Sequence, residues 1–482
     1  MEAVQTLGGR LHGYWQRFAE CFRTKTRDGA PYAYTYLSGL LRMDAKRNFA
    51  NIGRQSHTSG QNIQHFMSNS PWSAQEVIRQ VQREVIAKPG FQRGGVLIID
   101  ESAEEKAGEK SAGAARQYNG RLGKVDLSQV GVFLAYSNIS RAVAAPTWFW
   151  VDGELYLPEP WFAETEPMIK LRERLGIPEE RQFATKVELG WRMIERAVTV
   201  GLGFELVACD DNYGRSRWLR DQLDQAGLVY MADVPSDTQV YLAEPTIGVP
   251  ERGSKGRPPL RERVLSDERP VRINEVASRE DTTWQVVHVR ACERGEIADE
   301  FAVRQVWAQR AGGRQVPDRP EWLVIRREAN GRLNYSLSNA APESTPEQLA
   351  WLKCQRYFIE RANQDAKSEL GWDEFQAQKY RAWEHELALT VLASWFIAET
   401  KLDWARQFAR DPALAGEFAL EVLPRLSTAN VREMLRATMP LPQLTPKQAT
   451  DLVVEHLVNR TRAKKSRSNR RHNASSSPSP GM

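Results

Sequence analysis

The sequence predicts an α/β protein with a mixed sheet, a helical segment before the sheet and a β-rich insertion within it. Apolar residues recur at helical spacing over roughly the first 90 residues. From residue 94 the pattern changes to compact apolar runs that later alternate with helical segments, the order of an α/β protein. A stretch of further strand patterns interrupts this order before helices return. With 482 residues, 41% of them hydrophobic, the chain can bury a sizeable core.

The first 90 residues contain several amphipathic segments. LHGYWQRFAECF and YAYTYLSGLL show helical spacing, and SAQEVIRQVQREVIA starts with Ser73 followed by Glu76, the spacing of a capping box. Residues 1–90 hold twelve Lys or Arg against six Asp or Glu. A basic helical module suits DNA binding, and a solvated charged face is the alternative.

The predicted sheet begins at residue 94. Three apolar runs follow one another as strands, and the next segments alternate between helices that stop at glycines and further strands. We expect strands at 96–100, 130–137, 147–157, 204–210 and 228–234, and helices at 186–201 and 215–227.

Residues 235–344 form the predicted β-rich insertion. GVPERGSKGRPP is loop-like, whereas TTWQVVHVRA, DEFAVRQVWAQR, EWLVIRRE and GRLNYSLSN have strand character. Helix returns at Thr345 and runs to Gly371, and more helices follow to about residue 457. The predicted domains are a helical N-terminal domain, the first part of the core, the insertion, the helical remainder and a basic tail, at 1–90, 91–234, 235–344, 345–457 and 458–482.

Charge, hydropathy and cysteine content argue against a membrane-spanning, secreted or zinc-stabilised protein. The net charge is +5, and the tail from Asn459 holds seven Lys or Arg and no acid. We expect this Ser/Pro-rich tail to be disordered, either as a solubilising segment or as a contact to nucleic-acid phosphates. The longest apolar run, 387–398, is too short to cross a membrane, and the N-terminus lacks a signal-peptide pattern. Four scattered cysteines without CxxC spacing indicate a reducing cytoplasm and no structural zinc.

Three acids stand out by position: Asp100 ends the first predicted strand, Asp210 ends the fourth, and Glu360 lies on the helix after the insertion. Each alone is most simply a loop or capping residue. As a set they are more informative, because adjacent strands would bring Asp100 and Asp210 together and a helix across the sheet can add Glu360. Crowded carboxylates need a cation, and hard oxygen ligands favour Mg²⁺ or Mn²⁺. Two such ions can support phosphodiester cleavage.

The helix of Glu360 carries two cations. Arg356 lies four residues before Glu360 and Lys367 seven residues after it, so both are predicted to share its helical face. A salt-bridge ladder is one interpretation of this face. Beside a metal site, the same face would hold phosphates.

These motifs together resemble a known family. VLIIDESAEEKAG with GAARQYNGRLGKVDLSQVGVFLAY, VACDDNYGR, RYFIERANQDAKSELGWDEF and NIQHFMSNSPW are similar to DDE transposases of the IS4-like group, most closely the IS701-type insertion-sequence transposases. The resemblance covers roughly residues 15–400 and implies a ribonuclease H-like catalytic core.

The resemblance also implies residue roles. Asp100, Asp210 and Glu360 correspond to the metal-binding and catalytic triad, and Asp210 rather than Asp211 fits the family's DxxYG pattern with Tyr213. The family's last motif is Tyr, two residues, Arg, three residues, Glu, six residues, Lys. Arg356 and Lys367 fit it, but Lys353 stands at the tyrosine position.

The same family supplies further expectations for DNA. We expect phosphate contacts from Arg116, Arg121 and Lys124, in the predicted loop before the second strand, and from Tyr213, Arg356 and Lys367. In relatives the insertion holds a hairpin intermediate through a tryptophan. Trp284, Trp307 and Trp322 are candidates for this role, and each is better explained as a core residue.

The predicted function is that of a DNA transposase. It would bind the terminal inverted repeats of an insertion sequence as a homodimer in the bacterial cytoplasm, cut the ends, and join the 3′ hydroxyl to target DNA with two Mg²⁺ or Mn²⁺ ions. Water would be the first nucleophile and the 3′ hydroxyl the second. A transposase-derived DNA-binding protein without catalysis, or another ribonuclease H-like nuclease, are the alternatives.

Asp100 and Glu101 are adjacent acids that must differ in role. On an extended strand they point to opposite faces, so only one reaches a shared metal easily. The family pattern selects Asp100, and we expect Glu101 to face solvent or the following loop.

Overall fold

A computed structural model describes most of the chain. The described residues are 6–44, 46–140, 143–251, 259–292, 295–309, 316–317, 319–407 and 425–441, with isolated positions beyond. Met1–Thr438 form one compact unit, and Met439–Met482 form a second. Nearly all of the predicted basic tail lies outside the described residues. Within the described ranges, no helix combines the length and apolar character that a membrane span requires.

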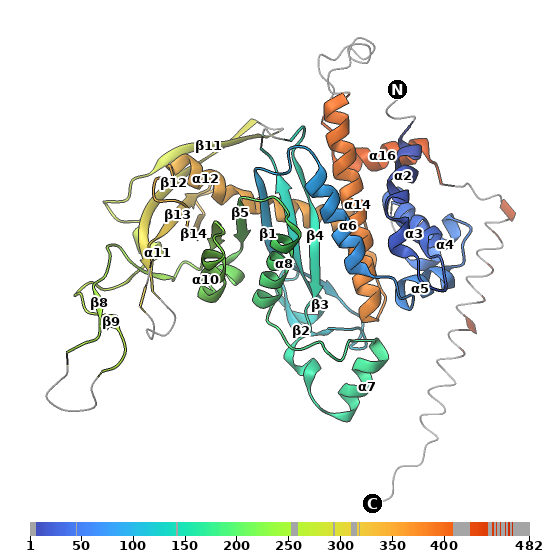
Figure 1. Cartoon of the computed structure of the whole chain (residues 1–482), viewed down its shortest axis with the longest axis horizontal. Coiled ribbons are helices and arrows are strands. Elements are labelled where there is room, and N and C mark those ends of the chain that lie inside the picture. The colour runs from blue at the N-terminus through green and yellow to red at the C-terminus, as the bar shows by residue number, and fades with distance from the viewer. Residues whose placement is uncertain are drawn as a thin grey trace, which may run out of the picture. The chain divides into compact units, whose positions relative to one another are not determined.

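The N-terminal region is helical, as predicted. Its main helices are α2 (Leu7–Gln16), α3 (Ala30–Arg42), α4 (Phe49–Gln55), α5 (Gly60–Ser68) and α6 (Ala74–Ala87). Ser73 caps α6 by accepting a hydrogen bond from the Glu76 amide, which confirms the predicted start. The long helix α14 (Tyr380–Gln407) contacts α3, α5 and α6 and also packs on strand β4, so it joins these helices to the sheet (Figure 1).

The centre of the molecule is a mixed sheet. Its central strands are β1 (Gly95–Glu105), β3 (Lys124–Asn138), β4 (Thr147–Leu155), β5 (Leu206–Cys209) and β6 (Tyr230–Asp233). They lie in the order β4, β3, β1, β5, β6, with β3 antiparallel to β1 and β4, and with β5 and β6 parallel to β1. This topology is consistent with the ribonuclease H-like core that the family resemblance implies.

Two predictions about the first strand are wrong. Asp100 does not end β1, because pairing with β3 continues from Glu101 to Glu105 and keeps the chain extended. The predicted loop before the second strand is a hairpin, in which β2 (Ala115–Asn119) pairs with the start of β3. The three-stranded ribbon therefore extends beyond the level of Asp100.

Helices cover both faces of this sheet. α8 (Lys186–Val200) ends at Gly201 in the left-handed conformation, and α10 (Arg217–Gln225) precedes Gly227, as the glycine stops predicted. α7 (Glu166–Leu175) and the short α9 (Asp211–Gly214) complete this part of the chain. α8 packs on β1 and β3, and α13 (Tyr357–Gln364) packs on β1, β3 and β4.

The strands of the predicted insertion continue the same sheet. β14 (Leu333–Ser338) pairs antiparallel with β6, and β13 (Glu321–Arg327), β12 (Gly295–Ala308) and β11 (Gln285–Cys292) follow in turn. β7 (Gln239–Tyr241) and β10 (Val271–Arg272) extend this end, and β8 (Ile247–Gly248) pairs with β9 (Arg263–Val264) separately. The predicted domain boundaries themselves stay a prediction.

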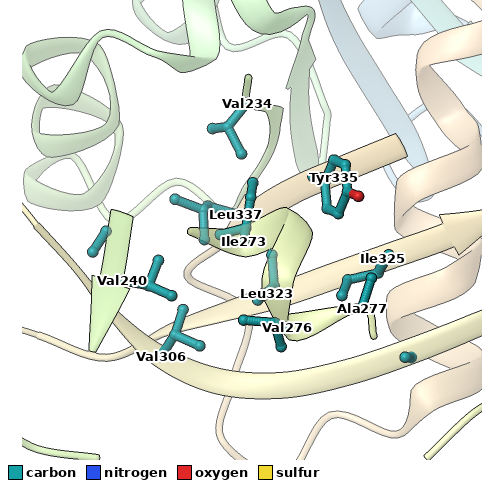
Figure 2. Close-up of a cluster of buried hydrophobic side chains, with 12 residues drawn as sticks. Val234, Val240, Ile273, Val276, Ala277, Val306, Leu323, Ile325, Tyr335 and Leu337 are labelled. Atoms are coloured by element: carbon teal, nitrogen blue, oxygen red, sulfur yellow. The ribbon is translucent and has the colours of Figure 1, made fainter. Parts of the chain in front are cut away.

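A hydrophobic core lies under these strands (Figure 2). Side chains from β7, β12, β13 and β14 pack against the short helix α11 (Ile273–Val276). Leu323, Ile325 and Leu337 alternate along their strands and are buried by this helix. The region thus has a core of its own in addition to its hydrogen bonds with β6.

The segment that carries Glu360 is not the single helix predicted from Thr345 to Gly371. α12 (Pro346–Lys353) starts at Thr345, whose side chain forms a capping box with Gln348. A 3₁₀ turn (Cys354–Arg356) leads into α13, and a π-helical turn (Asp365–Glu369) follows it. Gly371 ends the segment with φ of 76°. α16 (Thr428–Thr438) is the last helix of the compact unit.

Candidate functional site

Three aspartates lie level with one another at the point where strands β5 and β6 end. Ile99 of β1 is in register with Cys209 of β5, and Cys209 is in register with Ala232 of β6. The next residue on each strand is therefore Asp100, Asp210 or Asp233, and parallel strands place these neighbours side by side. The sequence prediction of adjacent first and fourth strands is confirmed. Asp233 was missed, although it lies next to the end of its predicted strand, 228–234.

Asp100 is held from two sides. Its Oδ1 accepts the Glu101 amide at 2.8 Å, and its Oδ2 accepts the Asn363 side-chain amide of α13 at 3.3 Å. Burial and, to a smaller extent, the negative charge of Asp210 raise the pKa of Asp100 to about 7. Ionised Asp100 is therefore costly beside Asp210 unless a cation lies close by.

Asp210 caps a helix and also lies level with Asp100. It is the N-cap of α9, and its Oδ1 accepts the amides of Asn212 at 3.0 Å and Tyr213 at 3.3 Å. Burial raises the pKa of Asp210 to about 6, although the Tyr213 amide opposes this shift. The capping interpretation and the metal-ligand interpretation of this residue are thus compatible.

Glu360 stands apart from the two aspartates. Its side chain is 53% exposed on α13, and its Oε1 accepts Arg356 Nη2 at 2.8 Å. Across the described ranges, no group of three or more His, Cys, Asp or Glu side chains lies close enough together to hold a metal ion. The structure therefore brings Asp100 and Asp210 together and leaves Glu360 paired with an arginine.

Asn363 is a second residue that the sequence did not reveal. It lies one helical turn after Glu360, and its Oδ1 accepts the Trp150 indole N–H at 2.8 Å while its amide donates to Asp100. A carboxamide fixed in this way orients the aspartate and stabilises its charged form. Because Trp150 and Asp100 come from strands distant in sequence, no local motif indicates this relay.

Glu101 occupies the opposite face, as strand alternation predicted, but it does not simply face solvent. Its Oε1 pairs with Lys186 of α8 at 2.7 Å, and its Oε2 accepts the Tyr213 hydroxyl at 3.3 Å. Tyr213 is 0% exposed. The structure therefore presents no surface of Tyr213 to DNA and uses its hydroxyl to hold Glu101.

Lys367 is bound to the sheet, whereas Glu360 is bound to Arg356. Its Nζ pairs with Glu104 of β1 at 3.0 Å. The π-helical turn that starts at Asp365 has more residues per turn than an α-helix, so the predicted two-turn alignment is lost. Lys367 thus ties this turn to the β1 ribbon.

The remaining candidate phosphate contacts lie on the β2–β3 hairpin. Arg116 is exposed in β2, Arg121 pairs with Glu105, and Lys124 pairs with Asp126 at 3.0 Å. Exposed ion pairs of this kind contribute little stability, so both cations can exchange their partners for phosphates. The structure places all three on one hairpin beyond Asp100.

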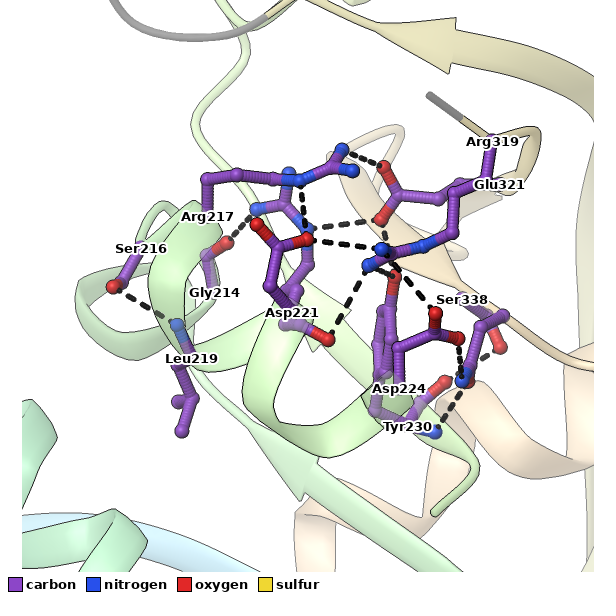
Figure 3. A network of polar contacts seen from close by, with 12 residues as sticks. Gly214, Ser216, Arg217, Leu219, Asp221, Asp224, Tyr230, Arg319, Glu321 and Ser338 are labelled. Carbon is purple, nitrogen blue, oxygen red and sulfur yellow. Dashed lines mark hydrogen bonds and ion pairs between the residues drawn. The ribbon is translucent and has the colours of Figure 1, made fainter. Parts of the chain in front are cut away.

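A buried polar network fixes the helices that follow Asp210 (Figure 3). Glu321 of β13 accepts Arg220 Nε at 2.9 Å, Arg217 Nη1 at 3.1 Å and the Tyr230 hydroxyl at 2.5 Å. Arg220 also donates to the carbonyl of Gly214, the last residue of α9. A Cβ on Gly214 would lie 1.9 Å from the Asp233 carbonyl oxygen, so this position requires glycine. The network therefore anchors the turn that carries Asp210.

Comparison with known proteins agrees with this geometry. The sequence profile of the DDE superfamily endonucleases matches residues 17–296. The chain belongs to the DDE superfamily endonucleases. It is also 26% identical over 321 residues to "Probable transposase for insertion sequence element IS701" of Microchaete diplosiphon, an alignment that covers 66% of this chain and 69% of that protein. The chain is thus a distant homologue of the IS701 transposase, and the predicted resemblance is confirmed.

Membership of the DDE endonucleases implies use of a divalent metal. Asp100 and Asp210 fit such an ion, because they are adjacent hard-oxygen donors whose mutual repulsion a cation would relieve. Glu360 fits by donor type but would have to exchange Arg356 for the ion. The profile match contains Asp100 and Asp210 and ends before Glu360.

Proposed function

We propose that this DDE endonuclease is a transposase that binds the terminal inverted repeats of an insertion sequence, cleaves at its ends and joins the freed 3′ hydroxyl to target DNA. The observation that carries the proposal is the level placement of Asp100 and Asp210 on adjacent parallel strands, in a chain of this family. The homology to an IS701 transposase favours transposition over other endonuclease chemistry.

We assign Asp100, Asp210 and Glu360 as ligands of two Mg²⁺ or Mn²⁺ ions. When bound, such ions supply charge neutralisation at phosphorus and activation of water. Asn363 orients Asp100, and the amides of α9 orient Asp210. Preorganised ligands of this kind lower the cost of assembling the site.

The DNA contacts in this proposal come from several regions. Arg116, Arg121 and Lys124 would bind phosphates along the hairpin beyond Asp100, and Arg356 would do so at the site itself. The basic helices of residues 1–90 would bind the repeats, and residues 235–344 would act as the insertion domain of a ribonuclease H-like core. Two paired ends imply a homodimer.

Cleavage of terminal-repeat DNA tests the assignment. The substrate is DNA with the inverted repeats identified by sequencing the regions on either side of the gene, and cleavage is measured with and without Mg²⁺. Asp100→Asn, Asp210→Asn and Glu360→Gln are each expected to abolish cleavage while repeat binding persists. Asp211→Asn is the matched control, because Asp211 is the exposed neighbour of Asp210. Undiminished cleavage by the Asp100 or Glu360 variant would refute the triad.

A pre-cut repeat end separates the alternatives. A transposase joins this end to target DNA, whereas another nuclease of the fold gives cleavage without joining. A DNA-binding protein without catalysis would bind the repeats and cleave in neither Mg²⁺ nor Mn²⁺. The pairing of Glu360 with Arg356 is the observation that favours this last alternative.

A further inference from the structure

Asp233, at the end of β6, is a further carboxylate near the candidate site. Both of its oxygens already contact other side chains. Its Oδ1 accepts Ser336 Oγ at 2.7 Å and Lys353 Nζ at 2.5 Å. Its Oδ2 pairs with Arg356 Nε at 3.1 Å. Although Asp233 is level with Asp210, it is bound to two cations of the chain itself. It is therefore placed to hold those cations rather than to bind a metal.

Lys353 is the more buried of the two cations. It is the last residue of α12, and its side chain is only 4% exposed. An ammonium group buried to this extent needs a partner, and Asp233 provides one. Lys353 stands where the family's last motif has a tyrosine, a neutral side chain that would not form this ion pair.

Arg356 lies among four carboxylates. Its Nε contacts Asp233 and its Nη2 contacts Glu360, while the charges of Asp100 and Asp210 also act on it. The guanidinium thus lies between Asp233 and Glu360, within range of the charges of Asp100 and Asp210. Its 3₁₀ turn connects α12 to α13, so Lys353 and Arg356 approach Asp233 from one short segment.

We propose that Asp233 and Lys353 are positioning residues, which anchor Arg356 on β6 so that its guanidinium neutralises the site without occupying the place of a divalent ion. The inference rests on the proposed metal-dependent function. Anchored on Asp233, Arg356 stays in place when Glu360 turns toward the two aspartates. Without the anchor, the remaining carboxylates draw the guanidinium onto themselves, and it competes with the ion.

The anchoring role of Asp233 and Lys353 is tested by measuring how tightly the full-length protein binds Mn²⁺ in the absence of DNA. Free Mn²⁺ is followed by electron paramagnetic resonance, and thermal unfolding is recorded for each variant. The anchor is removed as a neutral pair in Asp233→Asn/Lys353→Met, so that no buried charge is left unpaired. Arg356→Gln and the variant that combines all three changes complete a cycle. Ser336→Ala is a milder variant that takes one hydrogen bond from Asp233 and leaves every charge in place.

The anchor variant is expected to bind Mn²⁺ about tenfold more weakly, the usual scale for residues that support metal ligands. The combined variant is expected to bind as Arg356→Gln does, because the anchor acts only through Arg356. Ser336→Ala should weaken binding by a smaller factor. Unchanged affinity in the anchor variant, or an equal loss with and without Arg356, would overturn the inference and leave a purely structural ion pair.

The Asp100→Asn variant shows whether a negative result contradicts only the role of Asp233 and Lys353 or also the proposed metal-dependent function. If Asp100→Asn abolishes Mn²⁺ binding while the anchor variant binds normally, the inference alone is wrong. If Asp100→Asn binds Mn²⁺ as well as the unaltered protein does, both the metal assignment and the inference are wrong.

Discussion

A buried glutamate between the N-terminal helices and α14 should make stability depend on pH. Glu386 is 1% exposed, and it accepts the hydroxyl of Tyr36 at 2.6 Å. Burial raises its pKa from 4.5 to about 8, with a smaller rise from Glu374 and an opposing effect of the Tyr36 hydrogen bond. The folded state therefore favours the protonated acid.

The raised pKa of Glu386 determines how the free energy of unfolding changes with pH. Because the folded pKa lies above the unfolded value, the stability that protonated Glu386 contributes is complete below pH 4.5 and is lost as pH rises toward 8. At pH 7 the loss amounts to about 3 kcal/mol, since each pKa unit corresponds to about 1.4 kcal/mol. Glu386→Gln keeps an acceptor for Tyr36 and cannot ionise.

The assay is urea unfolding of both proteins between pH 4.5 and 8. We expect Glu386→Gln to exceed the unaltered protein by about 3 kcal/mol in free energy of unfolding at pH 7, and to match it near pH 4.5. Glu433→Gln, at an exposed position of α16, is the control and should leave the pH dependence unchanged. Parallel pH curves for Glu386→Gln and the unaltered protein would refute the reasoning.

Three further substitutions test the site and its supports. Asn363→Leu keeps the volume but removes the amide from Asp100, so single-turnover cleavage should fall about tenfold with repeat binding retained, and exposed Gln364→Leu is the control. Glu321→Gln leaves buried Arg220 without its countercharge, while Arg217 keeps Asp221, and should lower the free energy of unfolding in urea by about 3 kcal/mol, against no change for exposed Glu343→Gln. Gly214→Ala forces its Cβ against the Asp233 carbonyl and should lower unfolding free energy by about 2 kcal/mol, whereas Gly9→Ala in α2 has open space and should stabilise slightly.

Much of the fold could be predicted from the sequence, because it depends on patterns of residues close together in the chain. The Ser73 cap, the glycine stop at Gly201 and the strands β11 to β14 follow from residues close together in the chain. The extension of β1 past Asp100 was not accessible, because it depends on pairing with β3. Acidic residues 101, 104 and 105 looked like a loop but are tolerated in the strand by pairing with cations, such as Lys186 with Glu101 and Lys367 with Glu104.

At the candidate site, the sequence predicted the acidic residues but not the side chains that orient them. Family motifs indicated Asp100, Asp210 and Glu360, yet the partners that orient them come from distant segments. Asn363 is recognised only once α13 lies on Asp100, and Asp233 only once the register of β5 and β6 is known. The π-helical turn after Gln364 could not be inferred from helical periodicity, which assumed a continuous α-helix.

The segment that carries Glu360 is held by arginines at both ends. At its start, Arg356 is bound to Asp233 of β6. At its end, Arg432 of α16 pairs with Glu369 at 2.6 Å, and buried Arg47 pairs with Glu374 at 3.1 Å and donates to the Glu369 carbonyl at 3.0 Å. Buried charge pairs are costly to break, so the backbone of this segment is fixed to the sheet on one side and to the N-terminal helices on the other. The exposed Glu360 side chain is then the part that can change partners, and under the proposed function we expect it to reach the metal by a rotamer change rather than by a movement of the helix.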